Sequence, residues 1–446
     1  MMLLTAREIA AVVGAPYPEL GTDITVTRVV TDSRQVSQGD LFVAVVADRD
    51  GHEFIEAARA SGAVAWITSV ADDRRGAIAV QNTVSALQQL GSYARKRIRG
   101  GVIGITGSSG KTSTKDLAAS ILAERGPIAK SEKSFNNELG VPLTLVNAPD
   151  DLWAAVIEMG ARGIGHIAFL CSMASPTVGV VTNIGLAHRE LFGTAEATAD
   201  AKGELIESLP AAGVAVLNYD DAMFKRLRAR ASCDVLTFSA AGAGPADFWP
   251  SAIHLDASLR PSFTMHTPSG TFDVEMSVSG AHQVDNALAA AAAAMAVGAT
   301  ASEVQRGLAA ASASPWRMDL STLANGALLL NDSYNANPTS MAAALDALVT
   351  LNAKRRIAVV GTMAELGRDA AAEHRAIAEK ARAQMITLIV VDEPDYGVEP
   401  VAGVDGALAA LARIGAPRAG DAVLVKASRV AGLERVAQAL ARGSAT

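Results

Sequence analysis

The chain has 446 residues and a formal net charge of −7; half of its residues are hydrophobic and only 4% are aromatic. This length predicts two to four domains with sizeable cores, and the absence of a long Lys/Arg run argues against a dedicated nucleic-acid surface. The longest apolar run, residues 287–299, is shorter than the roughly 20 residues that span a bilayer. It therefore predicts a buried helix and no membrane span.

Compartment and redox state are indicated by the first residues and by the cysteines. Arg7 and Glu8 interrupt the apolar start, whereas a signal peptide carries its charges before its apolar run. Cys171 and Cys233 lack metal-ligand spacing, which predicts reduced thiols. We expect a cytoplasmic protein, and nothing in the sequence indicates an obligate oligomer, so we expect a monomer.

Three blocks follow one another along the chain. The first, 1–98, has strand-like runs within 26–46, a turn at Gly39, and a helix, a glycine stop and a strand over 52–69. The second, 99–313, has apolar strand runs at 101–106, 153–159, 177–184 and 213–218 with helical stretches between them, then a strand-rich insert at 247–279. This alternation predicts a parallel sheet flanked by helices.

The third block, 314–446, is a smaller α/β unit with strand runs at 356–361, 387–392 and 421–428. Its first strand ends in a glycine, as in dinucleotide-binding folds, but the G-x-G-x-x-G motif is missing, which argues against NAD. The whole chain is therefore predicted to be an α/β protein of three domains.

Residues 104–116, GITGSSGKTSTKD, resemble a phosphate-binding loop whose first glycine is displaced. The usual pattern, G-x-x-x-x-G-K-[ST], would place a glycine at 105, where the chain has Ile105. An apolar strand precedes the turn and a helix follows it, so backbone N–H groups and the helix N-terminus can surround a polyphosphate. In this interpretation Lys111 reaches the β and γ phosphates, and the Thr112 hydroxyl is a Mg²⁺ ligand.

Glu158, His188 and Lys202 are candidate partners of this loop. Glu158 ends an apolar strand and His188 follows another, so both are expected at the carboxyl edge of the sheet, where ligands bind. Taken alone, Glu158 is as compatible with a solvated strand end, His188 with a structural histidine, and Lys202 with a surface lysine. The N-K-x-D motif with which GTPases bind guanine is absent.

Together these residues form a recognisable set, and the chain resembles the Mur ligases over essentially its whole length. Eight motifs occur in the family's order: TGSSGKT (106–112), NNELGVPLTL (136–145), VIEMGA (156–161), TNIGLAH (182–188), AKGE (201–204), HQVDNALAA (282–290), SPWRMD (314–319) and NDSYNANP (331–338). The segments TDSR (31–34), GDLFVAV (39–45), GTMAELG (361–367) and VLVKASR (423–429) resemble the member that adds D-alanyl-D-alanine to UDP-N-acetylmuramoyl-tripeptide.

The resemblance implies an ATP-dependent ligase that makes the peptidoglycan pentapeptide precursor through an acyl phosphate. The implied architecture is an N-terminal UDP-substrate domain (1–98), a central P-loop ATPase domain with a parallel sheet (99–313) and a C-terminal Rossmann-like domain (314–446). The family's compact loop also accounts for the displaced glycine.

The resemblance also implies site residues. The phosphates would be held by Gly107, Ser108, Ser109, Gly110, Lys111 and Thr112, the adenine by Asn286, and the γ-phosphate and ribose sides by Arg317 and Asp332. The two Mg²⁺ ions would be held or supported by Thr112, Glu158, His188 and Lys202. The muramoyl-peptide would lie along Asn136 and Asn137, the uridine diphosphate at Ser33 and Arg34, and the amine substrate near Tyr334, Asn335 and Asn337. For NDSYNANP, a polar turn is the plainer interpretation.

Lys202 corresponds to a lysine that is typically carbamylated in Mur ligases. Carbamylation would reverse its charge and supply the oxygen ligands that Mg²⁺ prefers. The chain departs from the family at 41–54, LFVAVVADRDGHEF, which is about one residue short and lacks a basic-glycine pair; this segment belongs to the block implied to bind the UDP-substrate.

Two alternatives stay open. One is another ligase of the superfamily, MurE-like or folylpolyglutamate-synthase-like, although the D-N-P-R-type signature of MurE is absent and a folate ligase should lack the first block. The other is a non-catalytic nucleotide-binding partner, which need not keep Lys111, Glu158, His188 and Lys202 together. The sequence does not distinguish diaminopimelate from lysine as the third residue of the tripeptide.

Overall fold

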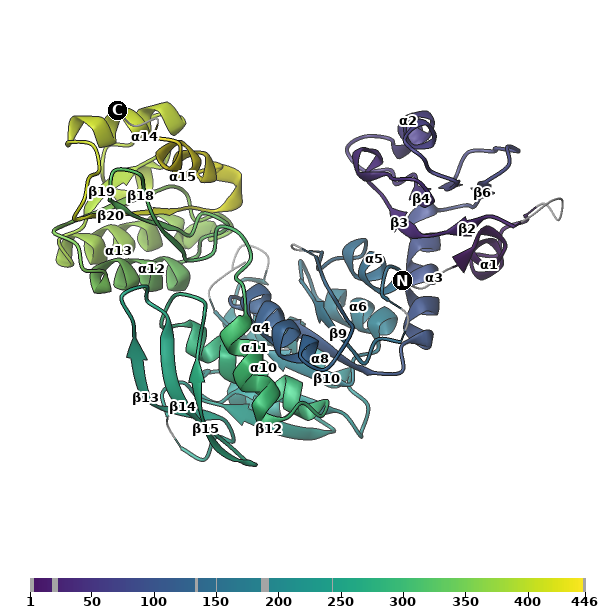
Figure 1. Ribbon diagram of the computed structural model, residues 1–446, viewed down its shortest axis with the longest axis horizontal. Helices are drawn as coiled ribbons and strands as arrows, with labels where there is room; N and C mark the ends of the chain where they lie inside the picture. Colours follow the sequence, from purple (N-terminus) through teal and green to yellow (C-terminus); the bar gives the residue numbers. More distant parts are fainter. Residues whose placement is uncertain are drawn as a thin grey trace.

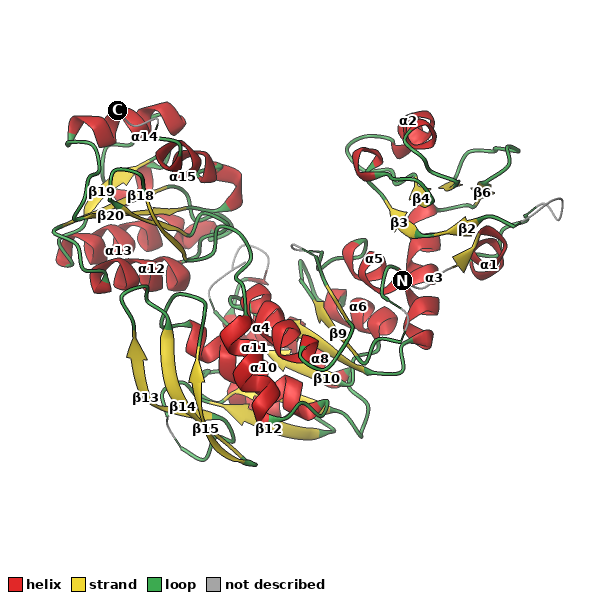
Figure 2. Ribbon diagram, viewed as in Figure 1, coloured by secondary structure: helices red, strands yellow, loops and turns green. Residues whose placement is uncertain are grey.

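In the computed structural model the chain forms three lobes arranged in an arc, with the N- and C-terminal lobes at opposite ends (Figure 1). The structure describes residues 4–17, 23–132, 135–149, 151–185, 192–242 and 244–443. Helices flank the sheets of the middle and C-terminal lobes (Figure 2). The expected α/β class is confirmed. Within the described ranges, no helix is long and apolar enough to cross a membrane.

The N-terminal lobe contains a parallel sheet in the order β3-β4-β5-β6 and a short antiparallel pair, β1 and β2. Its elements are β1 (Leu4–Thr5), α1 (Ala6–Val12), β2 (Thr25–Val26), β3 (Arg28–Val30), β4 (Asp40–Val43), α2 (Ile55–Ala60), β5 (Ala65–Thr68), β6 (Ala77–Ala79) and α3 (Thr83–Arg97), with 3₁₀ turns at Ser33–Gln35 and Gly51–Phe54. Helix α3 packs on the middle lobe, where a Cβ at Gly91 would lie 2.5 Å from Cβ of Pro142, so glycine permits the close approach.

The middle lobe is built on a six-stranded parallel sheet in the order β12-β11-β10-β7-β9-β8. Its strands are β7 (Gly101–Thr106), β8 (Ile128–Lys130), β9 (Ala154–Glu158), β10 (Val178–Val181), β11 (Val214–Asn218) and β12 (Asp234–Phe238). Its helices are α4 (Lys111–Ala123), α5 (Gly140–Val146), α6 (His166–Ala174), α8 (Ala195–Glu207), α9 (Phe224–Arg228), α10 (Gln283–Ala296) and α11 (Ala301–Ala310).

The strand-rich insert and the alanine-rich helix of the middle lobe share one core. The insert is an antiparallel sheet of β13 (Trp249–Leu255), β14 (Pro261–Thr267) and β15 (Gly270–Glu275). Helix α10 is buried among this sheet, the parallel sheet and α4, as predicted, although it spans Gln283–Ala296 and so ends before the predicted 299. Alanine suits this position because its small side chain lets neighbouring elements approach closely, and it has the highest helix propensity.

The C-terminal lobe has a five-stranded sheet in the order β16-β17-β20-β18-β19, parallel except for the edge strand β16. Its elements are β16 (Asp319–Thr322), β17 (Leu328–Asn331), α12 (Pro338–Thr350), β18 (Arg355–Val360), α13 (Ala370–Ala383), β19 (Thr387–Val390), α14 (Gly403–Arg413), β20 (Asp421–Lys426) and α15 (Glu434–Ala441), with 3₁₀ turns at Gly367–Asp369, Pro394–Tyr396 and Arg429–Ala431. Strands β1, β6, β8, β12, β16 and β17 were not predicted from the sequence. Strands β6 and β8 have only three residues each, which is too short a run to stand out.

Candidate active site

The loop between β7 and α4 favours glycine at two positions, where any other residue would be strained. Gly107 has φ +150° and Gly110 has φ +78°, values that L-residues rarely adopt. A Cβ at 107 would lie 1.8 Å from Oγ1 of Thr182, and one at 110 would lie 2.4 Å from Oδ1 of Asn286. Because the close approaches fall at 107 and 110, position 105 needs no glycine, and Ile105 is a buried strand residue.

The end of β10 holds this loop, a contribution that sequence reasoning missed. The Thr182 hydroxyl donates to the carbonyl of Ser109 at 2.6 Å, and Oδ1 of Asn183 accepts from the Ser109 N–H at 3.0 Å. The Ser108 N–H donates to the Asn183 carbonyl at 2.9 Å. Their place in the sequence could have identified Thr182 and Asn183, because polar residues directly after a parallel strand lie at the edge of the sheet where ligands bind.

Lys111, Thr112 and Glu158 meet at the carboxyl edge of the sheet, where Glu158 lies beside Ile105 in register. The Thr112 hydroxyl donates to Oε2 of Glu158 at 2.9 Å, and Nδ2 of Asn136 donates to Oε1 at 2.9 Å. Lys111 Nζ donates to the Gly107 carbonyl at 2.6 Å. Burial lowers the pKa of Lys111, whereas the nearby carboxylate of Glu158 opposes that shift.

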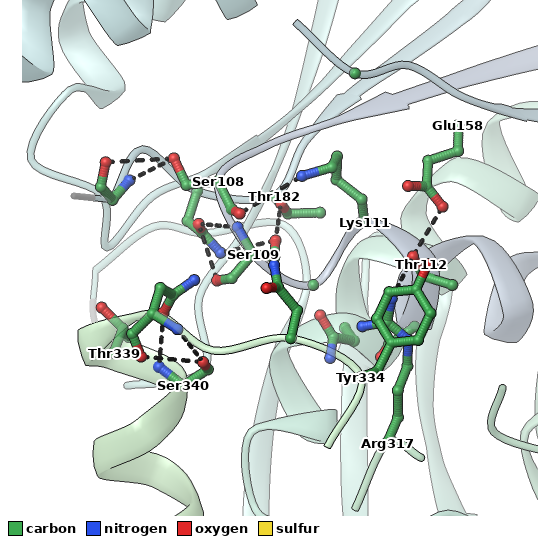
Figure 3. Close-up of a pocket in the computed structure, with 18 of the residues that line it drawn as sticks. Ser108, Ser109, Lys111, Thr112, Glu158, Thr182, Arg317, Tyr334, Thr339 and Ser340 are labelled. Carbon is green, nitrogen blue, oxygen red and sulfur yellow. Dashed lines mark hydrogen bonds between the residues drawn. The ribbon is translucent and has the colours of Figure 1, made fainter. Parts of the chain in front are cut away.

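The C-terminal lobe supplies a cation to the same place. Arg317 Nη2 donates to the Thr112 hydroxyl at 3.0 Å, and the guanidinium lies over the Tyr334 ring at 4.1 Å from its centroid. Figure 3 shows both side chains reaching toward Thr112, with Glu158 on its other side. Nε of Arg317 is buried without a hydrogen-bond partner among the described residues, so it is available to an incoming anion.

Asp332 is held by a lysine that sequence reasoning did not assign. Lys426, at the end of β20, is 1% exposed, and its Nζ donates to Oδ2 of Asp332 at 2.6 Å and to the Asn335 carbonyl at 2.8 Å. Oδ1 of Asp332 accepts from the Met318 N–H at 3.1 Å. Lys426 therefore neutralises the partly buried carboxylate of Asp332, whose side chain is 13% exposed, and ties it to the loop after β17.

Asn286 lies at the start of α10 and is almost completely buried. Its Oδ1 accepts from the Thr114 hydroxyl at 3.2 Å, and its Nδ2 donates to Gln283 at 2.9 Å. Asp285, beside it in the cavity lining, was also missed; burial, and then the charge of Asp220, raise its pKa to about 6.

Lys202 is buried, contrary to the surface position that its residue type alone favours. Its side chain lies on α8, is 1% exposed, and faces the Phe192 ring. Burial, and then the charge of Lys111, lower the pKa of Lys202 to about 7. At neutral pH a large share of this amine is therefore uncharged and nucleophilic.

A cavity of about 1090 Å³ gathers most of the expected residues. It is lined by Ser108, Ser109, Gly110, Lys111, Thr112, Asn136, Asn137, Glu158, Lys202, Asn286, Arg317, Asp332, Tyr334, Asn335 and Asn337. Gly107 adjoins it through its bond with Lys111. His188 lies outside the described residues.

Four of the expected substrate residues have structural roles or lie elsewhere. Ser33 and Arg34 do not line this cavity; they lie on the N-terminal lobe, where Arg34 pairs with Asp32 at 2.8 Å. Oδ1 of Asn137 accepts from the Gly140 N–H at 2.9 Å, and Oδ1 of Asn337 caps α12 by accepting from the Ser340 N–H at 2.9 Å. The side chains of Asn137 and Asn337 therefore hold helix starts at the cavity wall.

Family models match two stretches of the chain, the Mur ligase middle domain at residues 105–294 and the Mur ligase, glutamate ligase domain at residues 316–441. Over 430 aligned residues the chain is 37% identical to the UDP-N-acetylmuramoyl-tripeptide--D-alanyl-D-alanine ligase of Escherichia coli strain K12, an alignment that covers 94% of this chain and 95% of that protein. The chain belongs to the Mur ligase family.

Solved structures agree with this assignment to the Mur ligases. MurF from Acinetobacter baumannii superimposes with a TM-score of 0.87 at 29% identity, covering 99% of both chains. MurF from Thermotoga maritima in complex with ADP gives a TM-score of 0.80 at 29% identity, covering 94% of this Mur ligase and 97% of that chain. The resemblance drawn from the motifs is thereby confirmed.

Proposed function

We propose that this Mur ligase joins D-alanyl-D-alanine to UDP-N-acetylmuramoyl-tripeptide, using ATP and passing through an acyl phosphate, in the last cytoplasmic step that makes the peptidoglycan pentapeptide precursor. One observation carries the proposal: a single cavity is lined by the P-loop of the middle lobe and by Arg317 and Tyr334, with Arg317 Nη2 only 3.0 Å from Oγ1 of Thr112. An acyl group activated at the P-loop is thus within reach of an amine held by the C-terminal lobe.

The residues present fit a magnesium nucleotide. Thr112 and Glu158 offer a buried hydroxyl and carboxylate 2.9 Å apart, the hard oxygen donors that Mg²⁺ prefers. Thr112 and Glu158 would hold one ion, and Glu158, His188 and a modified Lys202 a second. Bound Mg²⁺ would neutralise charge on the phosphate oxygens. Asn286 and Asp332 would face the adenine and the ribose.

Activation solves a leaving-group problem, because a carboxylate would have to expel oxide to react with an amine. Transfer of the γ-phosphoryl group to a carboxylate oxygen releases ADP; the deprotonated amine then attacks the acyl carbon, and phosphate leaves. Two anions must approach each other in the first step, so positioning and charge neutralisation dominate catalysis. Lys111 and Arg317 supply the cations, and the backbone N–H groups at the start of α4 (Lys111–Ala123) orient the phosphates.

Lys202 supports the second metal position as a carbamate in this proposal. The ammonium first loses a proton to give the neutral amine. Addition of this amine to CO₂ then forms an N–C bond and releases a second proton, so the side chain's charge changes from +1 to −1 overall. An ammonium beside Mg²⁺ would be repelled, whereas a carbamate offers two oxygens. The burial of Lys202 in the lining of the same cavity supports this role.

The domain division and the substrate placement are parts of the same proposal. Residues 1–98 bind the UDP end near Ser33 and Arg34, 99–313 bind ATP, and 314–446 bind the amine near Tyr334, Asn335 and Asn337. Asn136 and Asn137 lie along the muramoyl-peptide. Because one chain lines the whole cavity, we propose a monomer, and because the reaction consumes ATP, we propose a cytoplasmic location.

Phosphate release from purified protein with ATP, Mg²⁺ and UDP-muramoyl-tripeptide tests the proposal. D-alanyl-D-alanine should be the best amine by a wide margin over D-alanine and L-amino acids. Turnover with glutamate and a folate, or with a diamino acid and a UDP-muramoyl-dipeptide, would favour the other ligases of the superfamily. ATP binding with no turnover on any UDP-muramoyl peptide would favour a non-catalytic binding partner.

A further inference from the structure

The segment that joins the middle and C-terminal lobes runs along one face of α4, the helix that follows the P-loop. The Ser314 hydroxyl donates to Oδ2 of Asp116, and Arg317 Nη2 donates to Oγ1 of Thr112 at 3.0 Å. Positions 112 and 116 are four residues apart and therefore share a helix face. The joining segment thus contacts α4 at two points one helical turn apart.

Ser314 is fixed to the middle lobe. Helix α11, which precedes the joining segment, lies so close to α4 that a Cβ at Gly307 would be 2.3 Å from Cα of Ile121. Asp116 is itself 7% exposed, and its Oδ1 lies 3.2 Å from Nζ of Lys115. The hydroxyl of Ser314 therefore bonds to a carboxylate that is already held in place.

The residues after Pro315 are fixed to the C-terminal lobe instead. The Tyr334 N–H donates to the Trp316 carbonyl at 3.1 Å, and the Met318 N–H donates to Oδ1 of Asp332 at 3.1 Å. Trp316 and Met318 have φ +63° and +49°, strained values that persist only where surrounding contacts impose them. Arg317, between them, therefore moves with the C-terminal lobe.

We propose that Asp116 and Ser314 form a positioning pair, which confines the hinge to Pro315 and thereby delivers Arg317 to the Thr112 hydroxyl. On the N-terminal side of Pro315, Ser314 bonds to the middle lobe, and on its C-terminal side the backbone of Trp316 bonds to the C-terminal lobe. Without the Ser314 anchor, the flexible segment extends from Pro315 back toward α11. The guanidinium of Arg317 then reaches Thr112 in a smaller fraction of the closed conformations. The inference rests on the proposed ligase function, because that function gives Arg317 its role.

Buried polar groups connect the carboxylate of Asp116 to that of Glu158. Lys115 Nζ donates to the Ser131 carbonyl at 3.0 Å, and the Glu158 N–H donates to the Ser131 hydroxyl at 3.1 Å. Asp116, Lys115 and Ser131 are all 7% exposed or less. The pair therefore belongs to the polar network that holds Glu158. Removing Asp116 would disturb both the contact with Ser314 and the position of Glu158. Ser314 is the cleaner position for a test.

The experiment compares Ser314→Ala with Ser314→Thr, which keeps the hydroxyl, and with Ser312→Ala, a matched change at an exposed serine of the same segment. Ser314→Ala should lower kcat about tenfold, the scale of one hydrogen bond to a charged group, with ATP affinity and thermal unfolding close to wild type. Ser314→Thr should retain most activity. Equal kcat for Ser314→Ala and Ser312→Ala would overturn the proposal.

A double-mutant cycle separates positioning of Arg317 from a general structural effect. In an Arg317→Ala background, Ser314→Ala should cost nothing further in kcat, and an undiminished cost there would refute the proposed mechanism. X-ray scattering with an ATP analogue should show a broader spread of lobe arrangements for Ser314→Ala, and identical curves would count against the hinge. If the wild-type protein is inactive with D-alanyl-D-alanine, the proposed function is wrong. The scattering comparison would still test the hinge in that case.

Discussion

Replacing Gly110 with alanine tests whether the loop geometry is as strict as the structure indicates. Gly110 has φ +78°, and a Cβ there would lie 2.4 Å from Oδ1 of Asn286. If the Asn286 side chain moves away from this Cβ, it loses two hydrogen bonds, because its Oδ1 accepts from Thr114 at 3.2 Å and its Nδ2 donates to Gln283 at 2.9 Å.

The expected cost of Gly110→Ala follows from these contacts. Left-handed backbone costs an alanine about 1–2 kcal/mol, and losing the two hydrogen bonds of Asn286 costs about 1 kcal/mol each. The free energy of unfolding should therefore fall by about 3–4 kcal/mol. The strain lies in the P-loop and beside Asn286, the proposed adenine position, so ATP affinity should fall about tenfold or more, each tenfold being about 1.4 kcal/mol.

Denaturant unfolding and calorimetric ATP binding measure both quantities. Gly126→Ala is the matched control, since a Cβ there would meet nothing closer than Cδ1 of Trp153 at 3.6 Å. In an Asn286→Ala background the clash disappears, and the cost of Gly110→Ala should shrink to the backbone strain alone. If Gly110→Ala unfolds within about 0.5 kcal/mol of wild type and binds ATP within about twofold, the reasoning is wrong.

Four further outcomes are expected. Lys111→Ala should lower kcat roughly 10²–10³-fold in a phosphate-release assay, as for loss of one electrostatic stabiliser; activity within about threefold of wild type would contradict it. Lys202→Arg should lose most turnover, and Lys202→Ala should regain part of it with added short carboxylates; near-normal turnover of Lys202→Arg would show that no carbamate is needed. Because burial lowers the pKa of Lys202 to about 7, its neutral amine becomes more abundant as pH rises through that value, so activation of CO₂-depleted enzyme by bicarbonate should increase from about pH 6 to about pH 8, and a flat profile would count against carbamylation. Scattering with an ATP analogue and the muramoyl substrate should show compaction of the C-terminal lobe onto the middle lobe, and an unchanged radius of gyration would contradict closure.

The sequence by itself determined the fold class, the P-loop and the family. The strand runs 101–106 and 421–428 stand out in the sequence because their central residues, 102–105 and 422–425, are apolar and buried, as expected for parallel strands covered on both faces. Gly-Lys-Thr at a strand–helix junction is equally local, because the loop and helix N-terminus that bind phosphate are contiguous in the chain. The position of Glu158 followed from the rule that strand ends meet at one edge of a parallel sheet.

Only the tertiary structure decided which side chains meet across long separations in the chain. Thr182 and Asn286 shape the loop that holds Gly107 and Gly110, and Lys426 neutralises Asp332 from another strand. Burial of Lys202, which lowers its pKa to about 7, depends on how α8 packs, and a lysine in a helical sequence gives no sign of it. Such environments depend on contacts between residues tens to hundreds of positions apart, and local sequence does not specify those contacts.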